Sequence, residues 1–191
     1  MKKNIYGICT GILILLSGLA HANGLNTLFD QVEKLRIERQ GYVLGAILNQ
    51  EQMKTAAANS VDAASNDTFK FKDDNVHVVA QKTSNRVLVI YEIFEDATQQ
   101  KIQDLIGDLY MNFDEPTILA HDKVVYWAYG EKKKITAAEF DTARQNKKIP
   151  GIIATIKFIS DINIMEKVKD VATGQAYYII SSDPLLEFFQ K

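Results

Sequence analysis

The fold is decided by residues 86–113, whose sequence is RVLVIYEIFEDATQQKIQDLIGDLYMNF. The first part, Val87 to Phe94, is a run of β-branched and aromatic residues that is apolar on nearly both faces. This pattern is typical of a strand covered on two sides. The period changes after Glu95 and Asp96. Apolar residues then recur at three- and four-residue steps, which places them on one face of a helix: Ile102, Leu105, Ile106, Leu109, Tyr110 and Phe113.

The rest of the chain supplies further strands and helices to this nucleus. A length of 191 residues fits one domain of ordinary size. We predict an α+β fold with a mixed or mainly antiparallel sheet of six or seven strands and packed helices, built from β–β–α and β–α units. In this interpretation residues 1–22 are a cleaved signal peptide, 23–67 an N-terminal helical segment and loop, and 68–191 the core domain.

Individual elements follow from periodicity and from turn and capping residues. Strands are expected at 69–72, 76–81, 87–94, 117–120, 123–129, 152–159 and 175–181, and helices at 25–40, 51–58, 102–113 and 161–172. Residues 42–48 fit either a strand or a buried helical turn. Thr136 and Glu139 have capping-box spacing, and Ser182-Asp183-Pro184 is typical of a helix start.

The N-terminus has the three parts of a secretory signal. Lys2 and Lys3 provide the positive end, residues 8–19 are almost wholly apolar, and Ala20-His21-Ala22 fits a small-x-small cleavage site. The apolar run is shorter than the roughly 20 residues that span a bilayer. We therefore expect cleavage after Ala22, no membrane span in the mature chain, and a periplasmic or secreted location.

Cysteine content and charge exclude several classes of function. The single cysteine, Cys9, lies inside the predicted signal, so the mature chain has no thiol for disulfides, nucleophilic attack or thiolate metal sites. The net charge of -2 gives no basic footprint for a nucleic-acid partner. The one basic run, Lys132-Lys133-Lys134, is interpreted as a solvated turn.

Candidate catalytic residues are few. His77 and His121 remain after signal removal, but neither lies in an H-x-x-x-H or H-E-x-x-H motif, so we predict no metal site. Glu92 falls within the apolar central strand, where a buried carboxylate could act as an acid. The alternative is that Glu92 lies near the strand end and reaches solvent or a lysine. No glycine cluster could cradle a phosphate, and no cofactor is expected.

The candidate binding residues are the aromatic group Tyr126, Trp127 and Tyr129. Alternation along a strand places Trp127 and Tyr129 on one face with Val125, and Tyr126 on the other. One face then belongs to the core. If the other is exposed, it offers the amphipathic aromatic surface typical of sites that bind protein or peptide.

The C-terminal third resembles a known family. Residues 156–159, 162–171 and the stretch YYIISSDPLLEFF at 177–189 look like the end of the chaperones of the periplasm and of the chloroplast intermembrane space that are related to the 22-kilodalton component of the inner-envelope import translocon. Members of that family similarly end with a strand and a Leu-Glu-Phe helix. The resemblance implies an α+β chaperone without an active site.

Together these features predict a non-enzymatic exported protein that binds a protein or peptide partner. It would act as a chaperone or as an accessory factor in secretion or envelope assembly. Two alternatives remain open: a small-molecule-binding module, and a hydrolase that uses Glu92, His77 or His121. The sequence does not decide the oligomeric state.

Overall fold

The structure is a computed structural model that describes residues 24–62, 65–148, 150–164 and 173–189. Its strands are β1 (Glu38–Arg39), β2 (Tyr42–Val43), β3 (Ser60–Val61), β4 (Thr68–Asp73), β5 (Val76–Gln81), β6 (Val87–Thr98), β7 (Ile118–Ala120), β8 (Val124–Tyr129), β9 (Lys134–Ile135), β10 (Ala154–Ser160) and β11 (Thr173–Ser181). Its helices are α2 (Gln50–Ala58), α3 (Gln99–Phe113), α4 (Ala137–Gln145) and α5 (Asp183–Leu186), with a 3-10 turn at Glu187–Phe189 and helical residues at 24–34. The predicted α+β class is confirmed.

Within the described residues, nine strands form one antiparallel sheet in the order β3-β4-β5-β6-β11-β10-β8-β7, with β9 paired to β8. β1 and β2 form a separate hairpin. The sequence predicts six or seven strands, because β3 and β9 have only two residues each and are too short to show an alternating pattern. The prediction of a mainly antiparallel sheet is confirmed.

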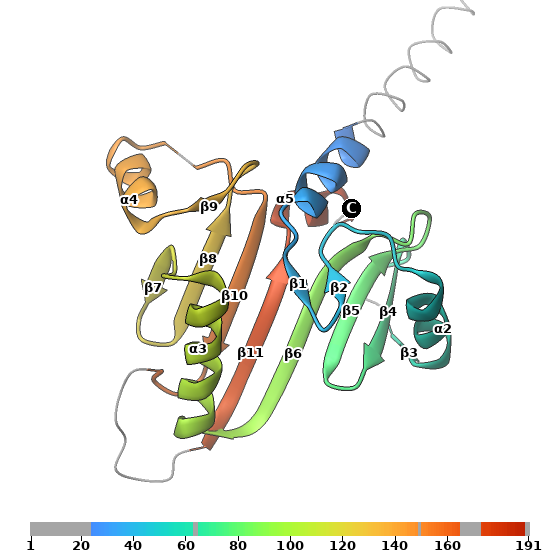
Figure 1. Cartoon of the computed structure of the whole chain (residues 1–191), viewed down its shortest axis with the longest axis horizontal. Helices are drawn as coiled ribbons and strands as arrows, with labels where there is room; N and C mark the ends of the chain where they lie inside the picture. Colours follow the sequence, from blue (N-terminus) through green and yellow to red (C-terminus); the bar gives the residue numbers. More distant parts are fainter. Residues whose placement is uncertain (1–23, 63–64, 149, 165–172, 190–191) are drawn as a thin grey trace, which may run out of the picture.

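One face of the sheet carries the core. Its central row crosses six strands in register and consists of fully buried residues: Phe71, Val78, Ile90, Ile180, Ile156 and Trp127. We call this side the covered face. Figure 1 shows α3, α2 and the β1–β2 hairpin on this side of the sheet. α3 packs on it through Ile102, Ile106 and Leu109, so the predicted strand–helix nucleus is confirmed.

β6 is longer than predicted, and α3 follows it directly from Gln99. The strand continues past Glu95 and Asp96 to Thr98, whose hydroxyl accepts a hydrogen bond from the Lys101 amide and caps α3. Asp96 has a positive φ of 51°, which bends the chain without ending the strand. The acidic pair is therefore inside the strand, and a hydroxyl caps the helix.

The predicted helix over residues 25–40 is wrong in its second half. Helical geometry ends near residue 34, and the chain turns into the β1–β2 hairpin. Gln40 and Gly41 have φ of 49° and 81°, the pair of positive values that a tight hairpin turn requires. Long-range contacts override the local pattern here, because Arg39 and Gln40 bind Glu92 on β6.

The C-terminal half follows the prediction closely. The β7–β8 turn contains His121 and Asp122, both with φ of 52°. Thr136 and Glu139 form the predicted capping box of α4, and Ser182 caps α5. The signal peptide predicted for 1–22 lies outside the described residues, as does most of the predicted helix 161–172; its first residues, 161–164, are not helical.

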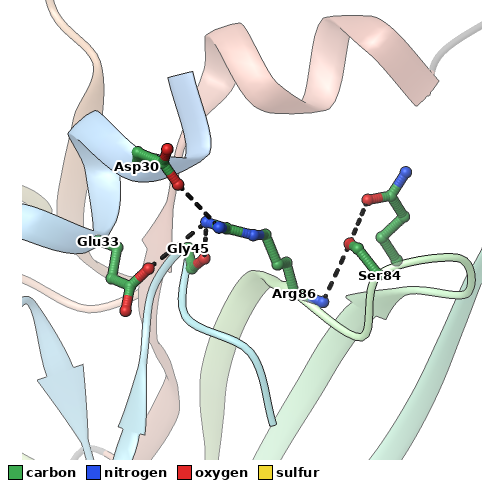
Figure 2. Close-up of polar contacts among 6 residues, drawn as sticks. Asp30, Glu33, Gly45, Ser84 and Arg86 are labelled. Atoms are coloured by element: carbon green, nitrogen blue, oxygen red, sulfur yellow. Dashed lines mark hydrogen bonds and ion pairs between the residues drawn. The ribbon is translucent and has the colours of Figure 1, made fainter. Parts of the chain in front are cut away.

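Arg86 ties the N-terminal helical residues to the sheet (Figure 2). It lies just before β6 and binds Asp30 at 2.7 Å, Glu33 at 3.4 Å and the Gly45 carbonyl at 3.1 Å. Its guanidinium also lies 5.3 Å from the centre of the Phe29 ring. A side chain at Gly45 would lie 2.9 Å from helix backbone atoms, so the close packing of the loop on residues 24–34 requires glycine there.

Candidate functional site

The second face of the sheet is less buried than the covered face. Along β5 and over residues 176–180 of β11, buried and half-buried residues alternate, which places the half-buried ones on the face opposite α3. The same alternation occurs in β8 and β10. We call this second side the open face; its side chains, nearly all half-buried, include Lys70, Lys72, His77, Val79, Val89, Tyr91, Ile93, Val124, Tyr126, Lys157, Ile159, Tyr177 and Ile179. The same face carries the exposed Glu95 and, next to α5, the buried Thr155 and Ser181.

The open face is mainly apolar and aromatic. One row crosses it in register from β4 to β7 and contains Lys72, His77, Tyr91, Ile179, Lys157, Tyr126 and Ile118. A parallel row contains Ile93, Tyr177, Ile159 and Val124. Residues directly opposite each other on neighbouring strands share a face and touch. The surface is therefore continuous across the sheet.

The charged residues in these rows are Lys72 and Lys157, both basic, and Lys70 lies beside them on β4. The Lys157 ammonium lies 5.2 Å from the Tyr126 ring centre, and that of Lys70 lies 5.8 Å from the Tyr91 ring centre, so both extend over aromatic rings. The His77 ring stacks on Tyr91 at 4.7 Å. Burial, followed by the charges of Lys70 and Lys72, lowers the pKa of His77, which keeps its imidazole neutral near pH 7.

Glu92 lies on the covered face and is 2% exposed. One carboxylate oxygen accepts hydrogen bonds from the Arg39 guanidinium, at 2.6 and 3.1 Å, and the other accepts one from the Gln40 amide at 3.0 Å. Arg39 also lies 5.0 Å from the Tyr178 ring centre. Glu92 is therefore buried within the strand, and its charged partner is an arginine; the alternative from the sequence, a Glu92 near the strand end that reaches solvent or a lysine, is wrong. The contacts fasten the β1–β2 hairpin to the sheet.

The candidate catalytic residues do not come together. Glu92 is on the covered face, whereas His77 is opposite Tyr91 on the open face. His121 lies in the β7–β8 turn at the far edge of the sheet, exposed to solvent. Across the part of the chain that the structure describes, no group of three His, Cys, Asp or Glu residues could hold a metal ion.

The three aromatic candidates have different surroundings. Trp127 is completely buried, donates a hydrogen bond to the Asp114 carbonyl at 2.8 Å, and packs against Tyr110 and Phe113 of α3. Tyr129 is half-buried, and its burial, with the charge of Asp114, raises its pKa to about 12. Tyr126 alone lies in a row of the open face. A partner on that face would therefore contact Tyr126 and not Trp127.

A surface depression of about 400 Å³ lies between the β8–β9 turn and the start of α4. Gly130, Ile135, Pro150 and Gly151 line it together with four charged residues, Glu131, Lys132, Lys133 and Glu139. These last two side chains bind each other at 2.6 Å. Since Lys133 and Glu139 already pair with each other, Glu131 and Lys132 are the charged groups left to orient a small ligand there.

Sequence reasoning singled out Tyr126 on the open face but missed Tyr91, Tyr177 and Ile179 as surface residues. The signal was present in the apolar odd-numbered positions of residues 87–93, which were interpreted as a second buried face. Which side of such a strand is covered depends on segments distant in sequence. Local pattern does not carry that information.

Comparisons with protein-family models, with curated proteins and with solved structures find no match for this chain. The resemblance of the C-terminal third to envelope chaperones therefore stays a prediction. None of the helices that the structure describes is long and apolar enough to cross a lipid bilayer.

Proposed function

We propose that the chain is a non-enzymatic, exported protein that binds other proteins through the open face, as a chaperone or as an accessory factor in secretion or envelope assembly. One observation carries the proposal. The central strands β6 and β11 are apolar on both faces, and α3, α2 and the β1–β2 hairpin pack on one of them. On the other face, α5 contacts β10, and Thr155 and Ser181 are buried at that end, whereas Tyr91, Ile93, Tyr177 and Ile179 are half-buried.

Strands in half-solvated sheets normally have polar side chains on the exposed face. Here that face presents Tyr91 and Ile93 on β6 and Tyr177 and Ile179 on β11. Contiguous apolar surface of this kind marks interaction sites in soluble proteins. Tyrosines favour protein contacts, because each joins a large apolar ring to a polar hydroxyl.

The sheet edges favour binding by the face over binding by strand addition. The edge strands are short: β3 has two residues and β7 has three. Short edge strands offer few unpaired backbone groups to an incoming strand. Side-chain contact with the open face is thus the better-supported mode of binding.

The test is suppression of aggregation of denatured, unrelated client proteins by the purified chain, without nucleotide. We expect suppression by the wild type. We expect it to be lost in the double variant Ile93→Thr/Ile179→Thr, which keeps β-branched side chains in the strands and makes two open-face positions polar. The matched control, Ile47→Thr/Met111→Thr, removes apolar side chains that are 58% and 86% exposed elsewhere.

Urea unfolding of each variant separates a lost surface from a lost fold. A control variant that fails like the open-face variant would show that general surface hydrophobicity, and not this face, protects the clients. No protection of any client by a several-fold excess of wild type would contradict a general chaperone function.

A further inference from the structure

We infer that the partner segment on the open face is an acidic amphipathic helix that lies across the strands, with its apolar side on Tyr91 and Ile179 and carboxylates at Lys70, Lys72 and Lys157. This inference rests on the proposed function and specifies the chemistry of the partner. It is carried by the charge and the spacing of the open face.

The charges of the two central rows of the open face have one sign, and Glu95 lies beyond them on β6. These two rows contain lysines and a histidine and no aspartate or glutamate. Among the described residues, neither Lys70 nor Lys72 has a carboxylate partner. Lys157 lies 3.5 Å from Asp183, which is outside these rows and 61% exposed.

The positions of the lysines fit a helix that crosses the strands. Lys72 and Lys157 lie in one register row, four strand spacings apart, with His77, Tyr91 and Ile179 between them. Four spacings of about 4.8 Å make about 19 Å. A helix rises 1.5 Å per residue, so about 13 residues span that distance. A helix of this length has room for carboxylates at both ends and an apolar stripe between them.

A second copy of the chain fits this surface less well. A two-fold interface presses the same surface of both subunits together. Here it would bring the two lysine-bearing faces against each other, with no acidic residue in the rows to pair with them. Like charges at an interface oppose association. An acidic partner instead gains the ion pairs.

The test measures binding of three synthetic helical peptides of about 14 residues to the full-length purified protein. All share one leucine stripe, and the flanking positions carry Glu, Gln or Lys. We expect affinity in the order Glu, Gln, Lys, with the Glu peptide weakening as salt is raised. The variant Lys70→Glu/Lys72→Glu should bind the Glu peptide about fivefold more weakly, the scale of two exposed ion pairs.

The matched control is Lys132→Glu/Lys148→Glu, which changes the net charge by the same amount at exposed positions away from the open face. It should bind like the wild type. Equal affinity for the Glu and Gln peptides would overturn the acidic preference and leave protein binding intact. Tighter binding of the Lys peptide, binding of anionic lipid vesicles in place of any peptide, or a dimer that buries Tyr91 would overturn the inference outright.

Discussion

At the residue scale, the most consequential contact joins Glu92 to the β1–β2 hairpin. Residues 39 and 92 are 53 positions apart, so no local pattern reveals that they pair. The sequence predicts that Glu92 is unusual because it interrupts an apolar strand, and it leaves open whether the carboxylate serves chemistry or structure. The described contacts of both its oxygens are those of a structural anchor.

Glu92→Ala should destabilise the fold, because it leaves the Arg39 guanidinium without its partner beside the covered face. Removing one member of a buried ion pair costs about 3–5 kcal/mol. Because the Arg39 side chain is 30% exposed, we expect a loss of unfolding free energy near the lower of these values. Glu51→Ala removes the exposed partner of Lys54 and should cost less than about 1 kcal/mol. Urea unfolding measures both; equal losses would contradict a structural role for Glu92.

Glu139 should titrate far below an ordinary carboxyl. Its hydrogen bond from Lys133, then those from Thr136, lower its pKa from 4.5 to about 2. Because the folded value lies below the unfolded one, Glu139 stabilises the start of α4 above about pH 4.5, and this contribution is lost as the pH falls toward 2. A pH titration by NMR measures the midpoint. Lys133→Ala should raise it; an unchanged midpoint would mean that Lys133 does not hold the carboxylate.

At the element scale, sequence patterns succeed where the interaction is local. The capping box of α4, the Ser182 cap of α5 and the apolar stripe of α3 all depend on residues three or four apart, and all appear as predicted. The β1–β2 hairpin is missed because its reason lies in tertiary contacts. Residues 24–34 are likewise held from a distance, by Arg86.

Arg86→Ala should loosen the N-terminal helical residues without unfolding the sheet. The variant loses two ion pairs, one of them exposed, and a hydrogen bond to the Gly45 carbonyl. Hydrogen bonds from charged groups contribute about 2 kcal/mol, so amides in 28–34 should exchange about tenfold or more faster while those of β6 stay protected. Arg86→Lys keeps the positive charge but loses the planar guanidinium that binds several acceptors at once. It should recover only part of the protection of these amides against exchange. If the amides of the whole sheet lost their protection against exchange equally, Arg86 would instead support global stability.

At the scale of the whole molecule, the sequence predicts the α+β class and most strands but not the one-sided cover. A strand that is apolar on both faces predicts two covering layers. The described part of the chain supplies one complete layer, through α3, α2 and the hairpin, and α5 contacts the open face at β10. The open face is the side of the sheet that the sequence pattern predicts to be covered by a second layer. It is the basis of the proposed function.

The most direct test places a photo-cross-linking phenylalanine analogue at Tyr91 or Tyr126 on the open face, and at Met111, which is 86% exposed on α3, as the control. Each protein is irradiated with one defined, unfolded apolar client. The account predicts adducts with the client from Tyr91 and Tyr126 and none from Met111. Adducts from Met111 alone, or equal yields from all three positions, would contradict the claim that the open face binds protein.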